Sequence, residues 1–257
     1  MRQNRPGFLD RLFLRQSLRG WRGAAAAAEV ADPAELRQLR TDARALRRDL
    51  DRVVQIADTR LAAPGGQGAA IPAPEMSDWK WRPDPWAGPL ASSGIAPVEN
   101  GAAGGQDAKL FHDCRVPELS LRQVRNTRET DLAPHGLQLD VFDFDGSYLS
   151  LVTELPAPAA QSLKARHILR VAAVVALERP LEVYVRLNLR QGPNTEQIVR
   201  ELPRDRADCF TEFDLAYSHI EGRKLDRAWV DLIFDNPRMN QIQLRDLTFS
   251  RRPRAEL

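Results

Sequence analysis

The sequence predicts an all-β antiparallel sandwich of the jelly-roll type, preceded by an α-helical hairpin or coiled-coil arm. Two changes of pattern along the chain lead to this prediction. Apolar residues recur at helical spacing before residue 62 and at alternate positions after residue 109, and Gly and Pro concentrate between these parts. We therefore divide the chain into a basic helical arm (1–62), a Gly/Pro/Ala-rich linker with a Trp motif (63–108) and a β-sandwich domain (109–257).

The second half of the arm carries the clearest helix signal. Asp32 precedes a proline and stands three residues before Glu35, the pattern of a capped helix start. Spacings of three and four then run through seven apolar residues: Leu36, Leu39, Ala43, Leu46, Leu50, Val53 and Ala57. This is the seam of a coiled coil over about three heptads, and Asp42 and Arg47 flank it at complementary positions.

The seam needs a cover, because an isolated amphipathic helix of this length is marginal in water. Residues 6–30 could fold back on it as a hairpin, or a second copy of the chain could pair through residues 36–57 in a homo-oligomer. The earlier segment also carries a stripe of arginines at helical spacing: Arg11, Arg15, Arg19 and Arg22. Such a stripe is typical of a helix on an anionic membrane surface, so peripheral contact with the inner membrane is a further alternative.

Charge and hydropathy indicate the cellular compartment of the protein and the kind of partner that it binds. The net charge is only +2, and the arm lacks a recognised DNA-reading motif, so nucleic acid is not an expected partner. The arm itself has thirteen arginines against eight acidic residues, which favours an anionic partner. Arginines interrupt the N-terminal apolar residues at every turn, and no stretch approaches the roughly eighteen apolar residues of a membrane span. We therefore expect a cytoplasmic protein.

The predicted linker contains an unusual group of tryptophans within residues 77–86. These are Trp79, Trp81 and Trp86. Exposed tryptophan is rare enough to require a docking surface. We expect the three indoles to pack on the sandwich as a strap, or alternatively to contact a ligand or partner.

Beyond residue 109 the periodicity changes to two. Residues 181–190 alternate without a break, with Leu and Val on one face and Tyr184, Arg186, Asn188 and Arg190 on the other. Similar runs begin near residues 119, 137, 148, 167, 196, 209, 228 and 242. About nine strands with short connections predict a sandwich. Asp145-Gly146 predicts a hairpin between two strands, and Gly192-Pro-Asn194 separates two more.

Several short stretches resemble an uncharacterised rhodobacterial protein family of unknown function. They are Asp78-Trp-Lys-Trp-Arg-Pro83, Phe111-His-Asp-Cys114, Arg125-Asn-Thr-Arg-Glu129, Gly192-Pro-Asn-Thr-Glu-Gln197, Glu212-Phe-Asp-Leu-Ala-Tyr217 and Leu244-Arg-Asp-Leu-Thr-Phe-Ser-Arg-Arg-Pro253. The resemblance covers nearly the whole chain and implies an alphaproteobacterial, non-secreted origin. It implies no activity and no catalytic residues. The final strand, Ile242 to Arg251, resembles jelly-roll carbohydrate-binding modules.

Motifs for catalysis, cofactors or metals do not stand out. His112, Asp113 and Cys114 are adjacent, but neighbouring strand residues point to opposite faces, so a metal site is not predicted. The acidic residues at Asp140, Asp143 and Asp145 fit a turn better than a calcium loop. Three further carboxylates on strands could form a catalytic pair only if their strands were neighbours: Glu212, Asp214 and Asp231. We therefore predict a protein without an enzymatic activity, a cofactor or a metal.

A non-catalytic binding or assembly protein is the function that these observations favour. Tyr184, Arg186 and Asn188 point outward and could join Trp229 and Asp231 in binding a carbohydrate-like ligand, with rings for stacking beside polar groups for hydroxyls. The rival hypothesis is a protein–protein scaffold, anchored by its arm to a partner or to the inner membrane. The scaffold would be favoured if the linker tryptophans filled the same face.

Overall fold

The structure is a computed structural model, and it describes residues 8–61, 71–90, 92–203, 209–220 and 224–254. The chain forms two compact units, residues 1–54 and residues 55–257. We describe each unit by itself.

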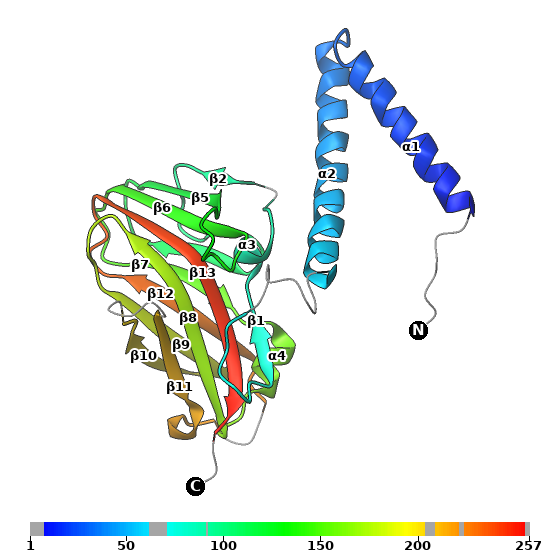
Figure 1. The fold of residues 1–257 in the computed structure, drawn as a ribbon. Coiled ribbons are helices and arrows are strands. Elements are labelled where there is room, and N and C mark those ends of the chain that lie inside the picture. The colour runs from blue at the N-terminus through cyan, green and yellow to red at the C-terminus, as the bar shows by residue number, and fades with distance from the viewer. Residues whose placement is uncertain (1–7, 62–70, 91, 204–208, 221–223, 255–257) are drawn as a thin grey trace. The chain divides into compact units, whose positions relative to one another are not determined.

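The first unit is helical, as predicted. It contains α1 (Phe8–Ala27) and most of α2 (Pro33–Leu61) (Figure 1). Asp32 caps α2, since its Oδ1 accepts hydrogen bonds from the backbone N–H groups of Ala34 at 2.7 Å and Glu35 at 3.0 Å. The predicted helix start is therefore confirmed. Among the described residues, no helix is long and apolar enough to cross a membrane.

The apolar seam of α2 is open in the single chain. Leu36, Leu50 and Val53 expose 37%, 55% and 63% of their surface, and Leu39 and Leu46 are half-buried. The side chain of Ala57 lies outside the described residues. At least three seam residues are thus uncovered in the single chain.

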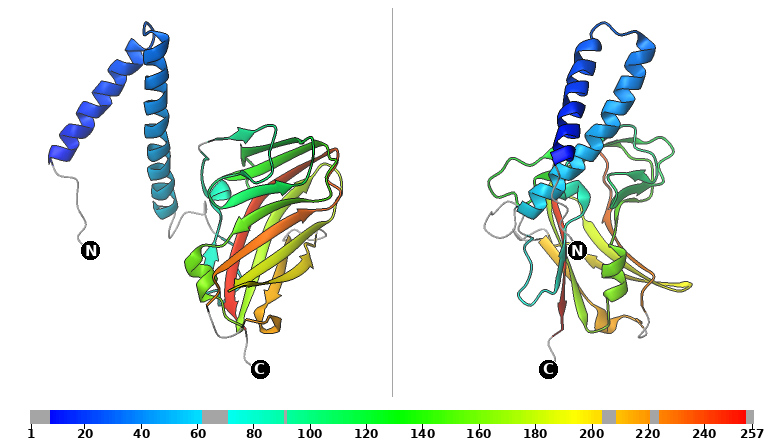
Figure 2. Two further views of the ribbon diagram at one scale, coloured as in Figure 1. Left: turned by 180° about the vertical axis from the view of Figure 1, so that it is seen from behind. Right: turned by 90° about the vertical axis from the view of Figure 1, so that its right-hand side faces the viewer.

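The second unit is a sandwich of two antiparallel sheets, which confirms the predicted fold class (Figures 1 and 2). One sheet has seven strands in the order β11-β8-β13-β6-β5-β2, with β1 beside the second half of β13. Its strands are β1 (Trp79–Trp81), β2 (Gly94–Ile95), β5 (Glu118–Arg125), β6 (His135–Asp143), β8 (His167–Leu177), β11 (Cys209–Asp214) and β13 (Asn240–Pro253).

The other sheet has six strands in the order β10-β9-β12-β7-β4-β3. They are β3 (Ala102–Ala103), β4 (Ala108–His112), β7 (Leu149–Glu154), β9 (Val183–Gln191), β10 (Asn194–Glu201) and β12 (Arg227–Phe234). The described residues of this unit also contain three short helical turns, namely α3 (Asp84–Ala87), α4 (Ala157–Ser162) and η2 (Leu215–Tyr217). All nine runs predicted from their period of two contain a strand.

The core lies between the sheets and follows the predicted alternation. The inward residues of the 181–190 run are buried: Leu181, Val183, Val185, Leu187 and Leu189. They meet apolar residues of the opposite sheet, such as Phe213 and Phe249, which are fully buried. Because one face of each strand is thus committed to the core, the other face of the six-stranded sheet points outward.

The turn at Asp145-Gly146 differs from the prediction. It joins β6 to β7, which belong to different sheets, so it is a crossover and not a hairpin. The loop closes around the carboxylate of Asp113, which accepts hydrogen bonds from the backbone N–H groups of Ser147 at 2.7 Å and Tyr148 at 3.1 Å. A Cβ atom on Gly146 would lie 2.5 Å from Asp113 Oδ1, so this close approach requires glycine. The prediction for Gly192-Pro-Asn194 holds, because this turn connects the paired strands β9 and β10.

The segment that composition marks as a linker contributes to both sheets between residues 79 and 108. Trp86 is fully buried and donates its indole N–H to the Leu244 carbonyl at 2.8 Å. Arg82 forms a buried two-point ion pair with Asp246, with both N–O distances at 2.8 Å. Composition suggests a linker because Gly, Ala and Pro are frequent, but these few large side chains attach the segment to β13.

Candidate functional site

The predicted ligand residues come from two neighbouring strands of the six-stranded sheet. Residues of β9 and β12 face each other in register, with Arg186 opposite Asp231 and Asn188 opposite Trp229. The alternating partners of these strands fill the core, so these four side chains belong to the outward face. The register therefore brings together residues that are more than forty positions apart in the sequence.

A cavity of about 430 Å³ opens on this face across β4, β7, β12 and β9. It combines aromatic and charged side chains. The aromatic ones are Phe111, Tyr148 and Trp229, and the charged ones are Asp107, Lys109, Glu154, Arg186, Arg227 and Asp231. Three basic and three acidic residues line the cavity, so their formal charges balance.

Asp231 is the most buried charged group of the cavity, with 2% of its surface exposed. Its Oδ2 accepts hydrogen bonds from Arg186 Nε at 2.6 Å and from Asn188 Nδ2 at 3.1 Å. Its Oδ1 is buried and has no hydrogen-bond partner among the described residues. A buried acceptor without a partner costs free energy, so this oxygen is the unsatisfied polar atom of the cavity among the described residues.

Trp229 is half-buried beside this carboxylate. The guanidinium carbon of Arg227 lies 5.2 Å from the indole ring centroid, a cation–π distance. Arg227 is itself held by Glu154 on β7, through N–O distances of 2.5 and 2.6 Å. The hydrogen bonds that Arg227 donates to Glu154 raise the pKa of Arg227, which keeps the guanidinium charged. The ion pair across the two strands thus holds Arg227 against the indole.

The rim of the cavity comes from the segment before β4. Asp84 accepts hydrogen bonds from the backbone N–H groups of Gln106 at 2.7 Å and Asp107 at 3.0 Å, and both of these residues line the cavity. Burial raises the pKa of Asp84. Gly105 has a φ of +119°, and a Cβ atom there would lie 2.8 Å from the Asp84 oxygens. Glycine therefore allows the rim to close around this carboxylate.

Only three of the five predicted ligand residues line the cavity. Arg186, Trp229 and Asp231 line the cavity. Asn188 is buried behind it, where it supports Asp231 and accepts a hydrogen bond from Gln197. Tyr184 stands on the same sheet face but outside the cavity. It donates its hydroxyl to Glu182, which raises the pKa of Tyr184.

The linker tryptophans lie on the side of the seven-stranded sheet and do not fill the cavity. Trp79 and Trp81 belong to β1, which pairs with β13. Their ring centroids are 6.2 Å apart, and that of Trp81 is 5.2 Å from the centroid of Phe249 in the core. Trp86 is fully buried against Leu244 of the same strand.

Sequence reasoning missed much of the cavity wall. Lys109 and Phe111 alternate on β4, and Tyr148 precedes β7, but no strand is predicted over residues 108–112. Their period of two is visible in the short run Ala-Lys-Leu-Phe-His. What sequence alone lacks is the pairing of β4 with β7, which places these residues beside β12.

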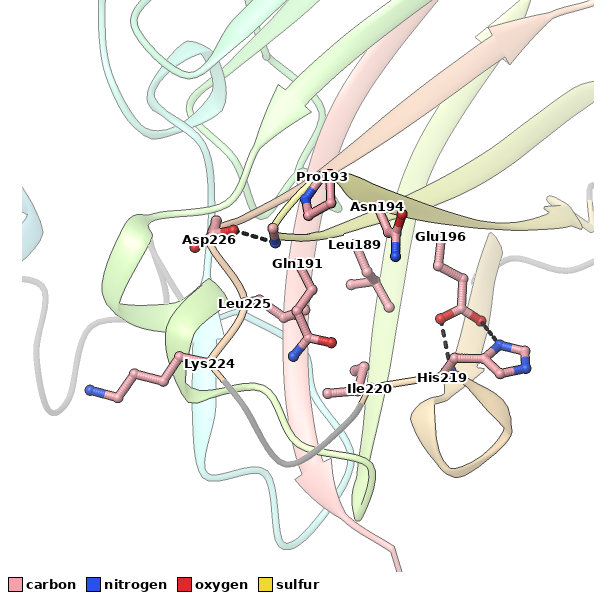
Figure 3. A pocket seen from close by; sticks show the side chains of 11 residues that line it. Leu189, Gln191, Pro193, Asn194, Glu196, His219, Ile220, Lys224, Leu225 and Asp226 are labelled. Atoms are coloured by element: carbon pink, nitrogen blue, oxygen red, sulfur yellow. Dashed lines mark hydrogen bonds and ion pairs between the residues drawn. The ribbon is translucent and has the colours of Figure 1, made fainter.

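A second cavity of about 460 Å³ lies beside the turn between β9 and β10 (Figure 3). Two of its carboxylates already accept hydrogen bonds from other residues of the lining. Glu196 accepts a hydrogen bond from the backbone N–H of His219 at 2.8 Å, and Asp226 accepts one from that of Gly192 at 2.6 Å. None of its lining residues is Trp, Tyr or Phe. The cavity on the sheet face is therefore the better candidate for a binding site.

Asp231 does not lie beside the other two carboxylates considered for catalysis. Glu212 and Asp214 lie on β11 of the seven-stranded sheet, whereas Asp231 lies on β12 of the other sheet. Glu212 and Asp214 pair with Arg252 and Arg254. Within the described residues, no group of three or more His, Cys, Asp or Glu side chains could hold a metal ion.

The arginine stripe of α1 is only partly described. Arg19 and Arg22 are exposed, whereas the side chains of Arg11 and Arg15 lie outside the described residues. Contact with a membrane or an anionic partner stays a prediction.

Comparison with known proteins places the chain in a family. A model of a family of unknown function, DUF6478, matches residues 1–257. The chain belongs to this family. The family resemblance seen in the sequence is thereby confirmed, while the rhodobacterial origin stays a prediction. No curated protein matches the sequence.

Solved structures share only the general architecture. The family 11 carbohydrate-binding module of Clostridium thermocellum, in complex with a β-1,3-1,4-mixed-linked tetrasaccharide, is 10% identical, with a TM-score of 0.38 over 64% of this chain and 98% of the module. TmCBM61, in complex with β-1,4-galactotriose, is 13% identical, with a TM-score of 0.31 over 61% and 94%. The tailspike protein 4 of bacteriophage CBA120 is 8% identical, with a TM-score of 0.38 over 58% of this chain, and the match spans only 21% of that chain. The function must therefore be argued from the site.

Proposed function

We propose that the outward face of the six-stranded sheet is a non-catalytic binding site for a neutral carbohydrate chain. The observation that carries this proposal is the juxtaposition of a half-buried indole, Trp229, with a buried carboxylate oxygen, Asp231 Oδ1, that has no partner among the described residues. A sugar presents both complementary features, a flat C–H surface for the ring and hydroxyl donors for the carboxylate.

The size and the lining of the cavity support a small polar ligand. Its volume of about 430 Å³ lies in the range of sites that bury a small molecule or a few units of a chain. Phe111 and Tyr148 add apolar surface to the same cavity. Phe111 comes from β4, Tyr148 precedes β7 and Trp229 comes from β12, so an extended ligand could contact more than one of these rings.

The charges of the cavity favour a neutral ligand. Arg186 pairs with Asp231, and Arg227 pairs with Glu154, so two of the three cations are compensated inside the site. A sulfated or phosphorylated chain would have to compete with these carboxylates for the guanidinium groups. Neutral polysaccharides need only hydrogen bonds, which this arrangement offers without breaking an ion pair.

The experiment is affinity electrophoresis of the full chain in gels that contain neutral polysaccharides, namely xylan, mixed-linkage β-glucan and β-galactan, followed by calorimetry with matching oligosaccharides. Trp229→Ala should weaken binding by roughly 5- to 150-fold, because stacking and ring burial contribute roughly 1–3 kcal/mol. Asp231→Asn, which keeps the shape but changes the acceptor, should weaken it as well. Tyr217→Ala is the matched control, since Tyr217 is an exposed ring, 77% accessible, beside the other sheet.

Two results would refute the proposal. One is the absence of binding to every neutral polysaccharide by a folded protein. The other is an affinity that falls equally in Trp229→Ala and Tyr217→Ala. Binding of a protein partner at this face, lost in Trp229→Ala, would favour the scaffold hypothesis instead.

A further inference from the structure

We infer that α2 pairs with α2 of a second copy of this chain as a parallel, in-register coiled coil. The occupant of the open seam is therefore another molecule of the same protein. The inference is independent of the ligand of the sandwich. It rests on the exposure of the seam and on the charges that flank it.

The seam itself defines the heptad register. The spacing of three and four makes Leu36, Ala43 and Leu50 equivalent to one another, at position a, and makes Leu39, Leu46 and Val53 equivalent, at position d. α2 is continuous from Pro33 to Leu61, so all six residues lie on one helix. Leu36, Leu50 and Val53 are 37%, 55% and 63% exposed. Leu39 and Leu46 are half-buried. An apolar stripe of about three heptads that stays exposed or half-buried requires a partner.

The flanking charges specify the partner. The residues before each a position, at position g, are Glu35, Asp42 and Asp49, all acidic. The residues after the first two d positions, at position e, are Arg40 and Arg47, both basic. All five side chains are exposed on α2. One edge of the seam is thus negative and the other is positive.

This separation of charge selects the orientation of the pair. In a parallel coiled coil, a g residue meets the e residue five positions later on the partner helix, so Glu35 meets Arg40 and Asp42 meets Arg47. In an antiparallel coil, g faces g and e faces e, so acids would face acids and arginines would face arginines. Like charges at these positions destabilise the assembly. The parallel arrangement is therefore the complementary one.

A parallel coil has a consequence for binding. The C-terminal ends of both α2 helices lie together, so the two sandwich units follow from the same end of the coil. Two weak sites on one assembly can engage a repetitive ligand at once, which raises the apparent affinity without new contacts.

Disulfide cross-linking of the full chain tests the inference. Leu36→Cys and Val53→Cys place a thiol near either end of the seam. Under mild oxidation, each variant should form a dimer with itself, because identical residues are neighbours in a parallel, in-register pair. Thr41→Cys is the matched control, since position 41 lies opposite the seam and should give no dimer. The unchanged chain controls for its own Cys114 and Cys209.

Each outcome decides the matter. Cross-linking only in a mixture of Leu36→Cys and Val53→Cys would show an antiparallel pair and overturn the inference. No cross-linking in any variant, with light scattering of the unchanged chain at the mass of one 28.9 kDa copy, would also overturn it. A charge swap gives a second measurement that does not depend on thiols. Glu35→Lys with Asp42→Lys should reduce the mass to one copy, and mixing with the Arg40→Glu, Arg47→Glu chain should restore the mass of two.

Discussion

Replacing Trp86 with Phe tests whether the segment before residue 109 is part of the sandwich. Trp86 is fully buried, and its indole N–H donates to the Leu244 carbonyl at 2.8 Å. Loss of this buried hydrogen bond costs about 1–3 kcal/mol. The smaller ring leaves a void of a few tens of Å³, which adds roughly 1 kcal/mol at about 24 cal/mol per Å³. We expect the free energy of unfolding to fall by about 2–4 kcal/mol, although the substitution keeps an aromatic residue.

The assay is urea unfolding of the full chain, followed by circular dichroism of the β-sandwich. In thermal unfolding of the same variant, the midpoint temperature should fall by roughly 5–15 °C for a unit of this size. Trp79→Phe is the matched control, because Trp79 is only half-buried on β1, and its free energy of unfolding should change by less than about 1 kcal/mol. Equal effects of the two substitutions, or a change below about 0.5 kcal/mol for Trp86→Phe, would refute the reasoning.

Two further predictions concern charge. Asp131 forms a buried ion pair with Arg245, whose hydrogen bond lowers the pKa of Asp131 below 3.8. Asp131→Asn should therefore cost about 3–5 kcal/mol at pH 7. That cost should shrink as the pH falls through the lowered pKa, because the stabilising carboxylate is then protonated in the native state too; a cost that is the same in urea titrations at pH 7 and pH 3 would contradict this. If α1 contacts an anionic membrane, Arg19→Glu with Arg22→Glu should abolish sedimentation with phosphatidylserine vesicles, and unchanged sedimentation would exclude these arginines.

The sandwich could be predicted because a half-buried strand shows itself in the sequence. The run from Leu181 to Arg190 alternates at every position, and its inward residues are the ones that the structure buries. The capped start of α2 at Asp32 is equally local, since both hydrogen bonds reach only two and three residues along the chain. Features that depend on neighbours in sequence were therefore predicted correctly.

Features that depend on distant partners were not. Asp145-Gly146 has the composition of a hairpin turn, but the strands that it joins belong to different sheets, and no local pattern encodes that choice. The segment around Trp86 appeared to be a linker, because its attachment to Leu244 spans 158 positions. Composition averages over all residues of such a segment, whereas only a few large side chains attach the segment to the sandwich.

The candidate site was predicted in part for the same reason. Arg186, Trp229 and Asp231 can be predicted to point outward, because the residues that alternate with them on their own strands are apolar. The cavity also needs Lys109 and Phe111, and these reach it only through the pairing of β4 with β7. Asp231 Oδ1 has no hydrogen-bond partner among the described residues because of three-dimensional packing, which no local sequence pattern encodes.

The most direct test of carbohydrate binding follows the indole N–H signals of the full chain by ¹⁵N nuclear magnetic resonance during titration with xylan, β-glucan and β-galactan oligosaccharides. With an oligosaccharide that binds, the Trp229 signal should shift and saturate. The Trp86 signal should stay in place, because its N–H is buried and bonded to Leu244. Shifts confined to Trp79 and Trp81, or no shift of any indole signal with any of the oligosaccharides, would contradict the proposed site.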